Sequence, residues 1–189
     1  WKPGATVGIT AAGGNGFGNG QSQLEEPGKI DIDSQGNLYI ADTGNNRIQK
    51  WEYGGLTGTT VAGGNGLGKG LNQLHNPFGI AVDKFGAIYI SELSNHRITK
   101  WNPGASEGEI VAGGNGEGSG ANQLAIPMGV AVNKNGDVYI ADTYNHRVQL
   151  WKKGSTEGKT LISGKDFKNG HETNYFSGIS IVNESYLYI

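Results

Sequence analysis

A period of 50 residues constrains this chain more than any other feature. Tryptophan recurs at positions 1, 51, 101 and 151, and the first three copies share the glycine-rich run G-G-N-G-x-G-x-G, which begins at residues 13, 63 and 113. Residues 51–100 and 101–150 are identical at 25 of 50 positions. Such a repeat is one supersecondary unit that buries its apolar surface by stacking against its neighbours.

The glycine-rich run of the second copy, GGNGLGKG at residues 63–70, nearly matches a phosphate-binding loop. That loop needs Ser or Thr after its Lys to hold Mg²⁺, and here Gly70 follows Lys69. The other copies have Asn19 and Ser119 in place of Lys69. We therefore interpret the run as part of the architecture and not as a nucleotide site.

Within one unit the apolar pattern has a period of two. In the second copy it predicts strands at residues 77–83, 87–90, 96–101 and 109–112, separated by the turn signals DKFG and NPGASEG and the polar loop SELSN. The chain has 34 glycines in 189 residues and no segment with a convincing helical period. Four short antiparallel strands per unit are typical of a blade of an all-β propeller. Three tryptophans end the third strands and are predicted to lie in the core between blades: Trp51, Trp101 and Trp151.

Three segments identify the repeat: YIADTGNNRIQKW, YISELSNHRITKW and YIADTYNHRVQLW, which follow strands of the P-x-G-I-A-V-D type. They resemble NHL repeats, and the resemblance covers nearly the whole chain. It implies a β-propeller of four-stranded antiparallel blades, usually six in a closed ring. Two departures are Arg47, Arg97 and Arg147 in place of the family's Leu, and a longer glycine loop. We expect one propeller domain over residues 1–189, with repeat units of about 1–50, 51–100, 101–150 and an incomplete 151–189.

The chain contains three full units and pieces of others. Residues 7–12 are predicted to form an outer strand with no blade before it, and residues 178–189 the two inner strands of a blade without its outer pair. We expect an open arc of a six-bladed propeller, whose remaining blades belong to the same full-length chain. An isolated arc exposes sheet edges and apolar blade faces.

Each loop between the second and third strands carries a carboxylate, an amide and a guanidinium. A set of this kind can bind a ligand or act in catalysis. Its recurrence at one place in every unit favours a structural role, in which the acidic and amide side chains cap the turn and the arginine ties blade to blade. In the second unit Glu92 replaces the aspartate, so a different geometry is expected there. The other members are Asp42, Asn45, Arg47, Asn95, Arg97, Asp142, Asn145 and Arg147.

Charge and composition bear on several functional classes. The net charge is −2, which gives RNA binding no support although some NHL propellers bind RNA. The chain has no cysteine and no apolar run of 18 residues, so disulfides and membrane spans are not expected. The four histidines, at positions 75, 96, 146 and 171, are not expected to converge on a metal, and no cofactor is predicted.

The loop tips suggest where a partner binds. Strands alternate in direction, so the glycine loop and the loop between the second and third strands emerge on the same face. Their sequences change from copy to copy on a constant framework, as expected of a recognition surface. The sequence predicts a non-catalytic module that binds a protein or peptide through Phe17, Leu67, Lys69 and Tyr144. The alternatives are an enzyme similar to the amidating lyase or a lactonase, with a channel metal, and an RNA-binding or ubiquitin-ligase-associated module.

Overall fold

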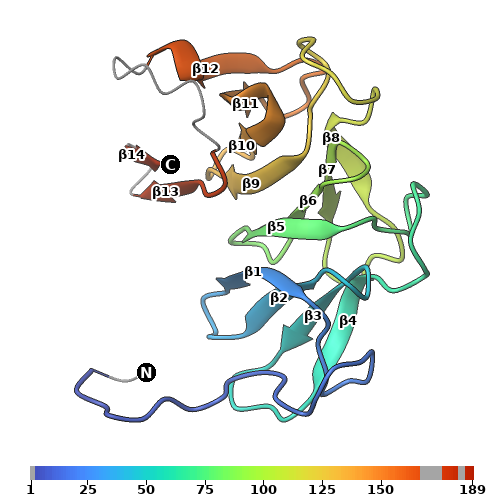
Figure 1. Ribbon diagram of the computed structural model, residues 1–189, viewed down its shortest axis with the longest axis vertical. Helices are drawn as coiled ribbons and strands as arrows, with labels where there is room; N and C mark the ends of the chain where they lie inside the picture. The colour runs from blue at the N-terminus through green and yellow to red at the C-terminus, as the bar shows by residue number, and fades with distance from the viewer. Residues whose placement is uncertain (1–2, 167–175, 183–185) are drawn as a thin grey trace.

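A computed structural model describes residues 3–166, 176–182 and 186–189 (Figure 1). In these ranges the chain forms strands, turns and two 3₁₀ helices, η1 (Thr143–Asn145) and η2 (Gly164–Asp166), which confirms the all-β class. The predictions about Trp1, His171 and the shortened region near 167–173 lie outside the described residues. Among the described helices, none is long and apolar enough to cross a membrane.

Three four-stranded antiparallel sheets follow one another along the chain, and each strand pairs with the next. The first sheet, blade 1, contains β1 (Pro27–Ile32), β2 (Leu38–Asp42), β3 (Arg47–Trp51) and β4 (Gly58–Gly63). Blade 2 contains β5 (Pro77–Val82), β6 (Ile88–Glu92), β7 (Arg97–Trp101) and β8 (Glu109–Gly113). Blade 3 contains β9 (Pro127–Val132), β10 (Val138–Asp142), β11 (Arg147–Trp151) and β12 (Lys159–Ser163). The strands predicted for residues 77–112 are confirmed as β5 to β8.

A two-stranded sheet follows blade 3. It pairs β13 (Ser180–Val182) with β14 (Tyr186–Tyr188), as predicted for the two inner strands of an incomplete blade. The sheets succeed one another around an open arc, and β1, β5, β9 and β13 lie on its concave side (Figure 1). Neighbouring blades meet through these strands, since β1 lies beside β5, β5 beside β9, and β9 beside β13.

The turn between the first and second strands follows from its sequence. In DKFG the Asp83 carboxylate accepts hydrogen bonds from the backbone N–H groups of Phe85 (2.8 Å) and Ala87 (3.0 Å). Gly86 adopts φ = 82°, a conformation that glycine takes without steric cost, and its N–H donates to the Asp83 carbonyl. The turn therefore needs an acid or amide at its start and glycine at its end.

The hydrophobic core lies between successive blades. One cluster joins Ile48 of blade 1 to Ile80 and Trp101 of blade 2. The next joins Ile98 of blade 2 to Trp151 of blade 3. Each interface therefore contains a fully buried tryptophan, which removes about 150–250 Å² from water. The blades are stabilised by stacking, as the repeat requires.

The predicted outer strand at residues 7–12 is wrong. The structure forms no strand there, and the Val7 and Ile9 side chains are exposed. A fourth strand is bonded to the third strand of its own blade, as β4 is to β3. The described chain offers residues 7–12 no such third strand, so their strand-like sequence has no hydrogen-bonding partner.

Candidate functional site: the glycine-loop face

The two kinds of loop predicted to share a face do so. We call residues 13–26, 63–76 and 113–126 the glycine loops, and the face that they form with the loops between second and third strands the glycine-loop face. In blade 1 the Asn45 amide donates to the Gly18 carbonyl (3.0 Å), and the Gly44 N–H donates to the Glu25 carbonyl (3.0 Å). Blades 2 and 3 repeat the amide contact through Asn95 and Asn145.

One arginine in each blade binds the glycine loop that leads into that blade. In blade 2 Arg97 donates from Nε to Glu92 Oε1 (2.8 Å). Its Nη1 donates to the Lys69 carbonyl (2.9 Å), and its Nη2 donates to the carbonyls of Gly70 (3.1 Å) and Gln73 (3.3 Å). The same four contacts recur for Arg47 and Arg147. The structure thus places each of these arginines against the loop that connects the preceding strands to its own blade.

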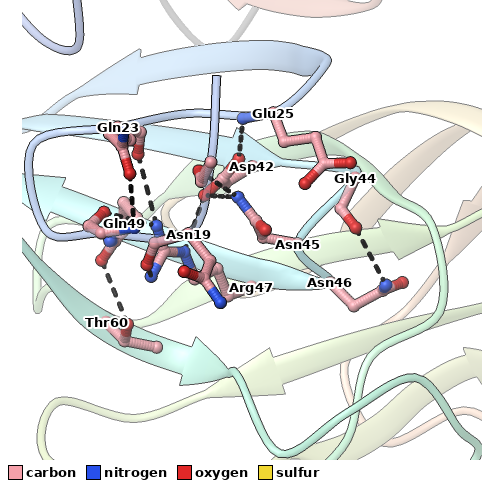
Figure 2. A network of polar contacts seen from close by, with 12 residues as sticks. Asn19, Gln23, Glu25, Asp42, Gly44, Asn45, Asn46, Arg47, Gln49 and Thr60 are labelled. Atoms are coloured by element: carbon pink, nitrogen blue, oxygen red, sulfur yellow. Dashed lines mark hydrogen bonds and ion pairs between the residues drawn. The ribbon is translucent and has the colours of Figure 1, made fainter. Parts of the chain in front are cut away.

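The carboxylates of this framework point inward. Asp42 accepts from Arg47, from Asn45 (2.9 Å) and from the Glu25 N–H (2.7 Å), as Figure 2 shows. Asp142 has the corresponding partners. Both side chains are fully buried, and their oxygens are occupied by protein donors. This arrangement positions a loop and directs neither the Asp42 nor the Asp142 carboxylate at a ligand.

Blade 2 carries the expected difference in geometry. The longer Glu92 accepts from Asn95 (2.5 Å) and from the Thr99 hydroxyl (2.9 Å) in addition to Arg97. Blades 1 and 3 have glutamine in place of Thr99, at positions 49 and 149. The extra methylene of Glu92 is thus accommodated by a shorter neighbour.

The glycine loop is held from inside by one glutamine. In the second loop Gln73 Nε2 donates to the Asn65 carbonyl (3.1 Å), and its Oε1 accepts from the Gly70 N–H (3.4 Å). A Cβ at Gly68 would overlap the Gln73 amide, so a side chain there would displace Gln73 from its hydrogen bonds to the loop. Gly66 has φ = 76° and faces open space, so glycine is required there by the backbone conformation alone.

The four predicted contact residues all lie on this face. Phe17 and Leu67 occupy the same point of successive glycine loops, where each bridges to a leucine further along its loop, and they are 72% and 62% exposed. Tyr144 lies in η1 beside the third glycine loop and is 53% exposed, and Lys69 is exposed. Phe17 lies in the first glycine loop, Leu67 and Lys69 lie in the second, and Tyr144 lies beside the third.

One framework position was missed by the sequence reasoning. Asn46 Oδ1 accepts from the Asn76 N–H of the next loop (2.9 Å), and His96 Nδ1 accepts from the Ile126 N–H (3.2 Å). Both residues adopt a left-handed backbone conformation, with φ = 51° and 50°. The sequence signal was the presence of Asn or His at the same repeat position, because both side chains can place a hydrogen-bond acceptor at a similar distance from the backbone.

His96 also approaches an acidic side chain. His96 Nε2 lies 3.9 Å from Glu117 Oε2, in the glycine loop that follows. Within residues 3–166, 176–182 and 186–189, no group of three or more His, Asp or Glu side chains could hold a metal ion.

Comparison with known proteins agrees with this geometry. The family model for the NHL repeat matches residues 24–51 and 124–150. None of the curated proteins matches the chain. Similar solved structures include a nidogen/laminin complex (18% identity, 85% of this chain and 54% of that chain, TM-score 0.62). Others are an auxiliary nutrient binding protein from Bacteroides thetaiotaomicron (16%, 87% and 44%, 0.60) and a virginiamycin B lyase from Staphylococcus aureus (16%, 90% and 49%, 0.57).

At these identities the likeness shows the fold alone. The chain spans about half the length of the solved structures that it matches. The two matched repeats, the four-stranded sheets and the propeller neighbours lead to the same result. The chain carries NHL repeats and forms an open arrangement of β-propeller blades.

Proposed function

We propose that this chain is a non-catalytic interaction module that binds a protein or peptide through the glycine-loop face. The observation that carries the proposal is the contrast between framework and tips. The charged framework groups are buried and bonded to the chain itself, whereas apolar side chains stand exposed at the loop tips. Exposed aromatic and aliphatic anchors are the groups that supply most binding energy at protein interfaces.

The contacts that we propose are Phe17, Leu67, Lys69 and Tyr144. The backbone of the second loop is fixed by Arg97 and Gln73, so its exposed side chains are presented from a defined position. Binding to fixed loops avoids most of the entropy cost of ordering them. These residues come from three repeats, which suits an extended partner more than a small ligand.

Two further points support this assignment over its alternatives. One of the similar structures is a complex of two proteins, nidogen and laminin. The net charge of −2 disfavours RNA, whose binding depends on neutralising phosphates. Similarity to a lyase at 16% identity concerns the fold and gives no independent support for catalysis.

The test uses peptides selected on the wild-type chain from a displayed random library. The variant replaces Phe17, Leu67 and Tyr144 together with alanine. The matched control replaces three exposed apolar residues in the turns of the opposite face: Tyr53, Leu56 and Phe85. We expect the first variant to lower affinity at least about 30-fold, since anchor residues cost about 2 kcal/mol or more when truncated.

Circular dichroism and urea unfolding establish that both triple variants are folded. The control is expected to bind like the wild type. If selected peptides bind the first variant as tightly as the wild type, the glycine-loop face is not the binding surface. If only the control loses binding, the partner uses the opposite face.

A further inference from the structure

A groove lies between blades 2 and 3 on the face opposite the glycine loops. Its walls are the DKFG turn at residues 83–86 of blade 2 and the NKNG turn at residues 133–136 of blade 3, and its volume is about 310 Å³. We call it the turn groove. Small-molecule sites typically have volumes of about 300–1,000 Å³, so the groove has room for a small ligand. Both blades that form it are complete four-stranded sheets, so its walls do not depend on other blades.

A buried tyrosine lines the turn groove and leaves its hydroxyl without a partner. Tyr89 is 4% exposed, and its ring packs in the core between blades 2 and 3. Among the residues that the structure describes, none forms a hydrogen bond with the Tyr89 hydroxyl, whereas the equivalent Tyr39 of blade 1 donates to Asp33 Oδ2 (3.3 Å). A largely buried hydroxyl without a partner is costly. The groove therefore holds a fixed donor that an added acceptor can use.

The lining of the turn groove has an excess of positive charge. Asp83 contributes one carboxylate, and its Oδ1 already accepts two N–H groups of its own turn. Beside the groove Glu109 pairs with Lys100 (3.0 Å). With both of these acids counted against the four lining lysines, an excess of two positive charges remains. The four are Lys84, Lys100, Lys134 and Lys153.

The equivalent groove between blades 1 and 2 has no such excess, since its lining contains two lysines and two aspartates. Two replacements in the wall formed by the later blade account for much of the difference. Asn133 stands where that groove has Asp83, and Lys153 stands where it has Pro103. The positive charge and the unpartnered hydroxyl thus belong to one groove and are not part of the common framework of the repeat.

We propose that the turn groove binds a phosphate group. A phosphate monoester carries about two negative charges at neutral pH and three strong acceptor oxygens. Tyr89 donates its O–H to one of these oxygens, and Lys153 and the neighbouring lysines supply the compensating charge. A single carboxylate leaves part of the positive charge unmatched. The group belongs either to a small phosphate monoester or to a phosphorylated side chain of a protein, which present the same chemistry.

The test is a titration with phenyl phosphate at low ionic strength, followed by the amide chemical shifts in ¹H–¹⁵N NMR spectra. We expect the amides of residues 83–86 and 133–136 to shift along one saturable curve. Tyr89→Phe keeps the ring and is expected to weaken binding about tenfold or more, because a hydrogen bond to a charged group is lost. The matched control Tyr39→Phe removes a hydroxyl that is already bonded to Asp33, and it is expected to bind like the wild type.

A second pair of variants tests the charge. Lys153→Gln is expected to weaken binding about threefold to fivefold, with a smaller effect at high salt. Lys159→Gln makes the same change in net charge at an exposed residue outside the groove and is expected to have no effect. A phosphoserine peptide is titrated in parallel. Tighter binding of this peptide than of phenyl phosphate, again dependent on Tyr89, assigns the phosphate to a protein partner, and the reverse order assigns it to a small molecule.

Three results overturn the proposal. The first is that neither phosphate probe shifts the amides of the two turns. The second is binding that Tyr89→Phe and Lys153→Gln leave unchanged, which shows unspecific attraction to lysines. The third is that benzoate binds as tightly as phenyl phosphate, which shows that the groove does not select phosphate.

This proposal goes beyond the peptide contacts of the glycine-loop face and stands or falls separately. The variant with alanine at positions 17, 67 and 144 is expected to bind phenyl phosphate like the wild type. Tyr89→Phe is expected to bind the selected peptides like the wild type. Failure of one proposal is therefore distinguishable from failure of the other.

Discussion

Replacing Arg97 with methionine tests whether the framework of the glycine-loop face is structural. Arg97 is buried, and its guanidinium neutralises the fully buried carboxylate of Glu92 at 2.8 Å. Methionine retains much of the apolar stem and removes every hydrogen bond of the head group. The decrease in the free energy of unfolding therefore reports the electrostatic role of the arginine and not its packing.

The loss of stability depends on the groups that lose Arg97 as a hydrogen-bond donor. The carbonyls of Lys69 and Gly70 lie in an exposed loop, so water can replace their lost donors at small cost. Glu92 has no access to water and retains only Asn95 and Thr99 as donors. An uncompensated buried charge of this kind costs about 3–5 kcal/mol. With a urea m-value of about 2 kcal/mol/M, the unfolding midpoint is expected to fall by about 1.5–2.5 M.

The assay is urea unfolding followed by tryptophan fluorescence, with two companion variants. Glu92→Gln added to Arg97→Met removes the unpaired charge, so the double variant is expected to be more stable than Arg97→Met alone. Lys100→Met removes a surface ion pair with Glu109 (3.0 Å) and is expected to cost no more than about 1 kcal/mol. If Arg97→Met costs no more than Lys100→Met, or if the double variant is the least stable, the buried charge is not what the arginine compensates.

Three further predictions concern the blade core. Trp101→Ala is expected to cost about 3–5 kcal/mol in urea unfolding, because it empties the core between blades 1 and 2, and a loss below 1 kcal/mol would contradict that placement. Gly108→Ala places a methyl group 2.5 Å from Trp101 Nε1 and is expected to cost about 1–3 kcal/mol with a changed tryptophan emission, whereas unchanged stability would refute the close approach. Burial raises the pKa of Tyr89 from 10.0 to about 12, helped by the negative charges of Asp83 and Glu109. The stabilisation from its neutral phenol is therefore complete below pH 10 and is lost as the pH rises through 12, and an absorbance titration against Tyr89→Phe that finds its phenolate near pH 10 would contradict this.

Strands and blades could be predicted from the sequence because each copy repeats the same local signals. The segment at residues 77–112 combines an alternating apolar pattern with a DKFG turn, and the structure places β5 to β8 there. Residues 7–12 carry the same kind of strand signal and still form no strand, because the hydrogen bonds of a fourth strand come from a third strand absent from their surroundings. Local pattern therefore decided the outcome only where a partner strand was present.

The framework contacts were harder to predict because they join residues about 25–30 positions apart. Arg97 was recognised as structural from its recurrence, but the direction of its contact depends on how the glycine loop folds back over its own blade. Asn46 and His96 place their acceptor atoms by adopting a left-handed backbone conformation. No local sequence pattern predicts this conformation. Recurrence indicated that these positions matter, and only the three-dimensional path of the loop showed what they contact.

Comparison of the three repeats distinguishes two kinds of variable position. Buried framework positions change in pairs, whereas exposed loop positions change singly. In blade 2 the longer Glu92 occurs with the shorter Thr99, which bonds to it, whereas blades 1 and 3 combine aspartate with glutamine. These two positions are buried together, so a change at one is accompanied by a change at the other. Leu67 replaces Phe17 at an exposed tip while the bridge to the following leucine and the arginine contacts of the loop are retained. Positions that vary without a compensating partner are free of packing constraints. On this chain they lie at exposed tips of both faces, at Phe17 and Leu67 in the glycine loops and at Tyr53 and Phe85 in the turns opposite, so variation alone does not single out one face.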